Sequence, residues 1–353
     1  MTHQVCVVPG DGIGQEVVPA AVEVLRATGL PLRFVWAEAG WACFQAWGTP
    51  LPPETLRLVR ESDAVLFGAT ASPSGAVPGY QSPILTLRQT LDLFANLRPV
   101  RSWPLPGCRE GVDLLLVREN TEDLYVRQER GDGERAVAER VVTRRASQRV
   151  ARVACQLARA RRGRLTVVHK ANVLPQTCGL FRQAVLEVAA TFPDLEVEEL
   201  LVDTAALHLV QAPERFDVLV TTNLFGDILS DAAAGLVGGL GLAPAGNIGE
   251  GPGVFEPVHG AAPDIAGRGI ANPLATILSG AMLLRHLGYG DVACQVEAAV
   301  EDVVAHGPHT PDLGGRAPTR EVTAAVVHAL ETRRQQACRN ALATPNPQSK
   351  EVQ

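Results

Sequence analysis

Residues 7–16 read VVPGDGIGQE and join an apolar, strand-like run to the helical pattern GQEVVPAAVEVLRAT. A glycine-rich turn between a first strand and a first helix is typical of Rossmann folds, whose glycines follow the spacing GxGxxG. In this stretch the glycines stand at 10, 12 and 14, which is too close for that spacing. The turn therefore predicts a tight strand-to-helix connection and does not by itself predict a cofactor site.

The composition is that of an ordinary globular chain. Its 353 residues exceed what one compact core usually takes, so we expect two lobes. A net charge of −6 gives no reason to expect nucleic acid as a partner. The longest apolar stretch, at 273–288, is interrupted by polar residues, which predicts a buried helix and no membrane association. No signal peptide is expected, because the strand-like QVCVV follows almost directly on the first residue.

The seven cysteines are scattered and include no CxxC pair. An odd number without metal-ligand spacing argues against a disulfide framework and against a zinc site. This usage favours a reducing compartment, so we expect a cytoplasmic protein.

Strand-like runs alternate with helical patterns, which predicts an α/β architecture with a parallel or mixed sheet. The runs AVLFGAT, VDLLLVREN, LTVVHKANV and DVLVTTNLFGD read as strands, whereas residues 84–97 read as one helix by their apolar spacing. Residues 235–273 are rich in glycine and proline, so we expect loops around a ligand there, with a long structural crossover as the alternative. The C-terminal tail, 336–353, is expected to be disordered.

Only two of the 32 lysine and arginine residues are lysines, Lys170 and Lys350. The chain thus uses arginine wherever a permanent cation suffices. Lysine differs in that burial can lower its pKa until it releases its proton. Because Lys350 lies in the tail, Lys170 is a candidate acid–base group, although a surface lysine without function is an equal alternative.

Two carboxylates mark the segment TTNLFGDILSDAAAG. Asp227 and Asp231 are four residues apart near the start of an expected helix, so both project from one face. Like charges at that spacing repel by roughly 0.2–0.5 kcal/mol, and a divalent cation would offset this. Asp203, at another strand end, is a candidate third ligand. An exposed pair stabilised by the helix N-terminus is the alternative.

Arg88, Arg98 and Arg118 each follow an apolar segment, at the end of an expected element. Guanidinium groups bind carboxylates in a bidentate manner, so three of them beside a metal would suit a small di- or tricarboxylate. For any one of them, a salt bridge to Glu119 or Asp92 is the alternative.

Six motifs then appear in a fixed order, and as a set they resemble the β-decarboxylating dehydrogenases that act on isocitrate, isopropylmalate, homoisocitrate and tartrate. The motifs are PGDGIGQE, DLFANLRP, VRENTEDLYV, HKANVLP, NLFGDILSD and EPVHGAAPDIAGRGIANP. The similarity covers residues 5–333. It implies a two-lobed isopropylmalate dehydrogenase-like fold with a mixed sheet, not a Rossmann fold. It also implies a cofactor-binding lobe made of 1–98 and 250–335, and a second lobe, 99–249, with the metal site and the dimer interface.

In this family the cofactor lies against the late loop, here HGAAPD. Asp264 would accept hydrogen bonds from the adenosine ribose and repel a 2′-phosphate, so the resemblance implies NAD. The implied cofactor-binding residues are Thr70, Ser72, Asn172, His259, Gly260, Ala261, Ala262, Pro263, Asp264 and Asn272.

The resemblance also implies a mechanism. Mg²⁺ or Mn²⁺ held by Asp203, Asp227 and Asp231 chelates a 2-hydroxy acid. Lys170 takes the hydroxyl proton during hydride transfer to NAD, CO₂ leaves, and Tyr125 protonates the resulting enolate. The implied substrate contacts are Ser72, Leu85, Arg88, Arg98, Arg118, Tyr125, Lys170 and Asn172. In the family, the lysine and the first aspartate reach in from a second subunit, which implies a homodimer or a larger homo-oligomer.

The segment GYQSPILTLR is expected to select the substrate, a small 2-hydroxy di- or tricarboxylic acid. Together with RENTEDLYV it looks most like homoisocitrate dehydrogenase, which oxidatively decarboxylates homoisocitrate to 2-oxoadipate in lysine biosynthesis. The apolar pair Ile84-Leu85 keeps 3-isopropylmalate of leucine biosynthesis open, and isocitrate is a further alternative. The remaining alternative is that the chain is a catalytically silent regulatory subunit.

Overall fold

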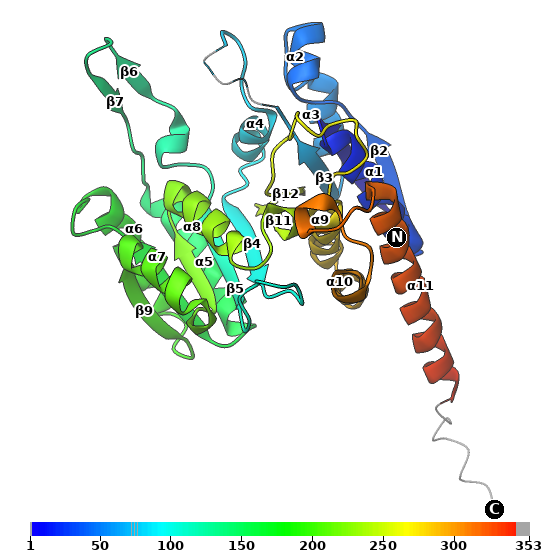
Figure 1. The fold of residues 1–353 in the computed structure, drawn as a ribbon. Coiled ribbons are helices and arrows are strands. Elements are labelled where there is room, and N and C mark those ends of the chain that lie inside the picture. The colour runs from blue at the N-terminus through cyan, green and yellow to red at the C-terminus, as the bar shows by residue number, and fades with distance from the viewer. Residues whose placement is uncertain (1, 72, 74, 76, 344–353) are drawn as a thin grey trace, which may run out of the picture.

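A computed structural model describes residues 2–343 except 72, 74 and 76. Within them, ten strands form one sheet in the order β2-β1-β3-β12-β11-β4-β5-β10-β8-β9 (Figure 1). These strands are β1 His3–Gly10, β2 Leu32–Trp36, β3 Ala64–Ala69, β4 Ala95–Arg101, β5 Asp113–Glu119, β8 Arg164–His169, β9 Glu196–Leu201, β10 Val218–Thr221, β11 Pro244–Ile248 and β12 Gly253–Pro257. Strands β6 Glu129–Gly131 and β7 Ala136–Ala138 pair separately as a projecting hairpin.

The sheet is parallel at both ends and antiparallel in the middle. Strand β1 pairs in parallel with β2 and β3, and β10 pairs in parallel with β5 and β8. In the centre, β11 runs antiparallel to β12 and to β4, and β4 runs antiparallel to β5. The predicted mixed sheet is confirmed, and this strand order differs from the Rossmann order.

Helices pack on the sheet in two groups (Figure 1). The helices are α1 Gly14–Ala27, α2 Trp41–Trp47, α3 Pro53–Arg60, α4 Pro83–Thr90, α5 Arg144–Arg159, α6 Thr177–Ala189, α7 Val202–Gln211, α8 Asn223–Gly235, α9 Leu274–His286, α10 Gly290–His306 and α11 Thr319–Ala343. The largest core cluster includes residues of α1, α9, α10 and α11. A second cluster packs α5 and α6 against β5, β8 and β10. The lobe boundaries at residues 98 and 250 remain predictions.

The structure corrects the expected helix over 84–97. Helix α4 ends at Thr90, and β4 already begins at Ala95. Asp92 adopts a φ of 48°, and the amide of Leu93 donates to the carbonyl of Arg88 at 2.9 Å, which closes the helix with a C-terminal cap. An aspartate tolerates this left-handed conformation better than most residues do, and the apolar spacing did not reveal it.

Two other expectations differ from the structure. The glycine-rich region 235–273 contains two strands, β11 and β12, in the centre of the sheet, so it is not made of loops throughout. Helix α11 includes residues 336–343 of the expected disordered tail. The apolar stretch at 273–288 does form the buried helix α9, and no helix among the described residues is long and apolar enough to span a membrane.

Helix α8 approaches β5 so closely that a glycine is required at the contact. A Cβ atom on Gly226 would lie 2.7 Å from Cγ of Arg118 and 2.8 Å from its Cβ. Arg118 is fully buried and cannot move aside. This contact fixes the distance between α8 and β5, and therefore the distance between Asp227 and the Arg118 guanidinium.

We expect Gly226→Ala to lower the free energy of unfolding by about 1–3 kcal/mol, because it overpacks this contact. Urea denaturation measures the change. Gly235→Ala on the same helix is the matched control, since a Cβ atom there meets nothing within 4 Å. The control should be neutral or stabilising by up to about 1 kcal/mol. Equal losses in the two variants would contradict the contact argument.

Candidate functional site

A cavity of about 190 Å³ lies where β3, β4, β12 and α4 meet. It brings together five of the predicted site residues from distant parts of the chain: Thr70, Arg88, Arg98, His259 and Gly260. Ile84 also lines it, whereas Leu85 is partly buried and is not among its lining residues. Predicted substrate-binding and cofactor-binding residues thus share one cavity.

Next to this cavity, two buried arginines converge on the carboxylates of α8. Arg98 on β4 donates to Asp231 at 2.9 Å and lies 3.2 Å from Asp227. Arg118 on β5 forms an ion pair with Asp227 as well. Strands β4 and β5 are antiparallel neighbours, and α8 lies across both. The fold therefore brings Arg98, Arg118, Asp227 and Asp231 together, and their roles in binding substrate and metal remain predictions.

Tyr125 belongs to the same cluster. It lies in the short 3₁₀ helix Leu124–Val126, its hydroxyl donates to Asp227, and the Arg118 guanidinium lies 4.9 Å from its ring centroid. Burial raises the pKa of the Tyr125 phenol, Arg118 opposes that shift, and the hydrogen bond to Asp227 adds to it. The phenol is therefore protonated at neutral pH and has a proton to donate.

The two carboxylates of α8 titrate in opposite directions. Burial favours a higher pKa for Asp227, but Arg118 and Arg98 outweigh it and hold the pKa below its usual range. For Asp231 burial prevails over Arg98, and the pKa is raised. Their side chains are 33% and 48% exposed, so their oxygens remain accessible to a hard cation. Two oxygen ligands on one helix face fit part of a Mg²⁺ or Mn²⁺ site.

Lys170 and Asp203 form a separate pair. Lys170 follows β8 and makes an ion pair with Asp203, which lies in the first turn of α7 and has a 61% exposed side chain. The hydrogen bond from Lys170 lowers the pKa of Asp203. Within one chain, the described residues contain no group of three histidine, cysteine or acidic side chains that could hold a metal. In one chain, Asp227 and Asp231 therefore lie together on α8, whereas Asp203 lies apart from them on α7.

The remaining predicted residues lie mostly on loops. Asn172 is exposed after β8, close to Lys170 in the chain, and Ser72 lies outside the described residues. Pro263 and Asp264 are exposed in the loop after β12, and Ala262 there adopts a φ of 39°. The side-chain amide of Asn272 donates to Asp312 at 2.9 Å and accepts at 3.0 Å from the backbone amide of Leu274, the first residue of α9.

The glycine-rich turn after β1 contacts the loop after β12, which contains HGAAPD. The amide of Ile13 donates to the carbonyl of Ala261 at 2.9 Å, and a Cβ atom on Gly12 would lie 2.0 Å from that oxygen. Glu16 accepts a hydrogen bond from the amide of Gly267 at 2.6 Å. The turn PGDGIG therefore makes close backbone contact with the loop that contains HGAAPD, which explains Gly12 without a bound phosphate. Cβ atoms on Gly10 and Gly14 would instead meet the carbonyl oxygens of Ala69 and Pro9.

Sequence reasoning missed a buried polar network behind the arginines. Glu256 on β12 accepts from Arg88 at 3.0 Å and from Asn247 on β11 at 2.8 Å. Asn247 in turn accepts from Asn96 at 2.9 Å and from Asn120 at 3.0 Å. Asn96 also accepts from Arg98 at 2.8 Å, so the network continues to the second arginine.

This network joins Arg88 and Arg98 through β12, β11 and β4. Asn247 is fully buried, and its side-chain amide makes four hydrogen bonds, because its nitrogen also donates to the carbonyl of Val254. In the sequence, polar residues within otherwise apolar strands could have indicated this network, because buried polar groups need hydrogen-bond partners in the fold. Ser230, which accepts from Arg98 at 2.7 Å, carried no comparable signal.

Comparison with known proteins agrees with these motifs. The model of the isocitrate/isopropylmalate dehydrogenase family matches residues 4–328. An isocitrate/homoisocitrate dehydrogenase of Thermus thermophilus is 57% identical, over 94% of this chain and 100% of that protein. A 3-isopropylmalate dehydrogenase of Archaeoglobus fulgidus is 49% identical, over 93% and 99%.

Among solved structures, an isocitrate dehydrogenase from Methylococcus capsulatus superimposes with a TM-score of 0.90 at 45% identity, and the match covers 94% of this chain and 100% of that one. The resemblance predicted from the six motifs is therefore confirmed at the level of the family and of the fold. The chain belongs to the isocitrate/isopropylmalate dehydrogenase family and is a β-decarboxylating dehydrogenase.

Proposed function

We propose that this chain oxidatively decarboxylates homoisocitrate to 2-oxoadipate with NAD, in lysine biosynthesis. The observation that carries the proposal is the convergence of Arg88 and Arg98 on one cavity beside Tyr125, Asp227 and Asp231. Such a cluster suits a substrate with more than one carboxylate and a proton-donating step. The 57% identical relative named for isocitrate and homoisocitrate supports the choice of acid.

Isopropylmalate and isocitrate are the alternative substrates. Ile84 places an apolar side chain in the cavity, which would suit the alkyl group of isopropylmalate, and one relative carries that name. Isocitrate is favoured by the names of the Thermus and Methylococcus proteins. Since all three acids share the malate core, the arginines and aspartates serve each of them equally. The preference among the three acids therefore depends on residues such as Ile84, which would contact the part in which the acids differ.

The arginines bind and orient the substrate. Arg88 is held by Glu256, and Arg98 by Asn96 and Ser230, so each guanidinium has a fixed direction before substrate arrives. Arg118 is fixed through its Nε, which donates to Asn223 at 2.9 Å. Groups that are already ordered lose little entropy when they bind a carboxylate, and this makes binding tighter.

A divalent cation and NAD complete the proposed site. Mg²⁺ or Mn²⁺ would be held by Asp227 and Asp231 with Asp203 of a second copy of the chain, and would supply electrophilic polarisation of the hydroxy acid. NAD would be bound by the loop around Asp264 and would supply the hydride acceptor. The low pKa of Asp227 keeps that ligand ionised at neutral pH.

Two residues move protons. Lys170 is proposed to take the proton of the substrate hydroxyl, since an amine can accept it where an arginine cannot. Tyr125 is proposed to deliver a proton to the carbon that has lost CO₂. Its raised pKa keeps the phenol protonated until that step.

A homodimer with shared sites is part of the proposal, because among the described residues of one chain Asp203 does not join Asp227 and Asp231 in a group that could hold a metal. Large apolar side chains are exposed on the same helices: Leu207 (53%) and Val210 (62%) on α7 and Ile228 (59%) on α8. Clusters of this kind on neighbouring helices mark a protein interface. A second copy packed there would bring Lys170 and Asp203 of one chain toward the α8 aspartates of the other.

Relative activity on three acids tests the substrate. With Mg²⁺ and NAD, kcat/KM for homoisocitrate should exceed that for 3-isopropylmalate by about tenfold or more, a margin that differences in pocket contacts readily produce. NADH absorbance follows the reaction. A tenfold preference for isopropylmalate would overturn the choice of acid, and no turnover of any acid would favour the silent-subunit alternative.

Lys170→Met should lower kcat by about 10²–10⁴-fold, because it removes the proton acceptor. Binding of NADH, measured by fluorescence titration, should change little. Lys350→Met, at the chain's only other lysine, is the matched control and should leave kcat unchanged. A Lys170→Met enzyme with near-native kcat would refute the assigned role.

Mixed dimers test the shared site. Lys170→Met and Tyr125→Phe enzymes should each be nearly inactive, but co-refolding them in equal amounts should restore up to about a quarter of native activity. Half of the random dimers are mixed, and each mixed dimer has one of its two sites intact. If the mixture stays as inactive as its components, Lys170 and Tyr125 act within the same chain.

A further inference from the structure

A second and larger cavity lies on the opposite face of the sheet from the arginine cluster. It encloses about 630 Å³. Along β4, side chains alternate between the faces of the sheet, so Leu97, Pro99 and Arg101 lie on the face opposite to Arg98. All three line this cavity, whereas Arg98 lines the smaller one. We call it the rear cavity.

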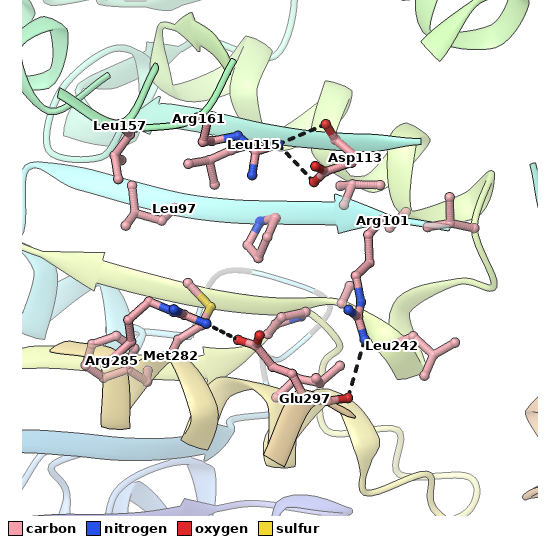
Figure 2. A pocket seen from close by; sticks show the side chains of 18 of the residues that line it. Leu97, Arg101, Asp113, Leu115, Leu157, Arg161, Leu242, Met282, Arg285 and Glu297 are labelled. Atoms are coloured by element: carbon pink, nitrogen blue, oxygen red, sulfur yellow. Dashed lines mark hydrogen bonds and ion pairs between the residues drawn. The ribbon is translucent and has the colours of Figure 1, made fainter. Parts of the chain in front are cut away.

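The walls of the rear cavity are mainly apolar and come from both groups of helices. Its floor is formed by β4, β5 and β11, with Leu97 and Leu115 pointing into it (Figure 2). Leu157 on α5 contributes one wall, and Leu278 and Met282 on α9 contribute the other. Small-molecule sites are typically cavities of about 300–1,000 Å³ with mostly apolar walls and a few polar groups. The rear cavity meets that description.

The polar groups of the rear cavity gather at its rim. Figure 2 shows Arg101 and Arg285 reaching Glu297 from opposite sides, while Arg161 meets Asp113 on the other side of β4. The lining contains three guanidinium groups and two carboxylates, and two further carboxylates, of Asp217 and Glu301, pair with Arg161 and Arg101 from outside it. His286 also lines it, and burial lowers the pKa of that imidazole, so it adds no positive charge near pH 7.

Arg101 is the least engaged of the three arginines. Its guanidinium lies 4.0 Å from the ring centroid of Trp103, which holds it at the rim. Its polar contacts are long, at 3.4 Å to the carbonyl of Glu297 and 3.5 Å to the carboxylate of Glu301. By contrast, Arg161 and Arg285 have carboxylate partners at 2.8–2.9 Å. Arg101 therefore has donors available for a stronger acceptor than a backbone carbonyl.

We propose that the rear cavity binds a small amphipathic carboxylate, of the medium-chain fatty acid class, with its chain between α5 and α9 and its carboxylate at Arg101. The Arg101 guanidinium, whose present acceptors lie at 3.4 and 3.5 Å, favours an anion, and the apolar walls favour an alkyl chain. The site is separate from the proposed substrate cavity, and it does not include Leu207, Val210 or Ile228 of the proposed dimer surface. It stands whether or not homoisocitrate is the substrate.

Calorimetric titration of the full-length protein with hexanoate, octanoate and decanoate, below micelle-forming concentrations, tests the apolar part. Affinity should rise about fourfold for each added methylene group, since burial of each contributes a nearly constant free energy. Decanol should bind about tenfold more weakly than decanoate, because it lacks the charge that Arg101 pairs with. Equal affinity for decanol and decanoate, or none for either, would overturn the proposal.

Variants locate the binding. Ala160→Trp places an indole at the cavity wall and should weaken decanoate at least tenfold. Ala190→Trp is its matched control, because both alanines are exposed and end their helices in the same conformation, and Ala190 does not line the cavity.

Arg101→Gln should weaken decanoate about tenfold and leave decanol unchanged. Arg57→Gln, at a surface ion pair on α3, should change neither. Circular dichroism and the Tm establish that each variant is folded. Decanoate binding that Ala160→Trp and Arg101→Gln leave intact would place the ligand elsewhere and refute the rear cavity.

Discussion

The balance between buried guanidinium groups and the carboxylates of α8 is the constraint on which the site depends. Arg118 is fully buried, and burial together with Arg88 and Arg98 lowers its pKa to about 10. It still carries its charge at neutral pH, and that charge needs a counter-ion because an unpaired buried ion is costly. Asp227 is that counter-ion for Arg118 and also contacts Arg98. The aspartate that is proposed to bind a metal thus also stabilises the folded chain without one.

This dual use has a consequence for binding. A substrate carboxylate bound by these arginines, as proposed, would compete with Asp227, Asp231 and Glu256 for the same donors. A cation at the aspartates would relieve that competition, because it takes over part of the negative charge. Cation and carboxylate should therefore bind more tightly together than either does alone, which is positive coupling between two ligands of one site. The Asn96–Asn247–Glu256 network limits how far the arginines can move during such an exchange.

The sequence was a good guide where a residue type has few uses, and a poor one where partners lie far apart in the chain. Asp227 and Asp231 could be paired because four residues on a helix define one face, and the six motifs named the family. The end of α4 at Thr90 was not predictable from apolar spacing, since it depends on the left-handed backbone of Asp92. Asn247 and Glu256 were missed because their roles depend on partners more than a hundred residues away. The rear cavity had no signal, since its walls are ordinary core residues from several elements.

The contact between the first turn and the late loop also bears on how the chain acquires its structure. Strand β3 pairs with β12, so the edge of β3 stays unpaired until residues 253–257 have been synthesised. Gly12 can pack against Ala261 only after that. Pairings so distant in sequence form slowly, because much chain entropy is lost before they are made. Strands β5, β10, β8 and β9 can meanwhile pair with one another and pack against α5 and α6, since these strands are neighbours in the sheet and share one core cluster with the two helices. The middle of the polypeptide is thus able to mature before its beginning does.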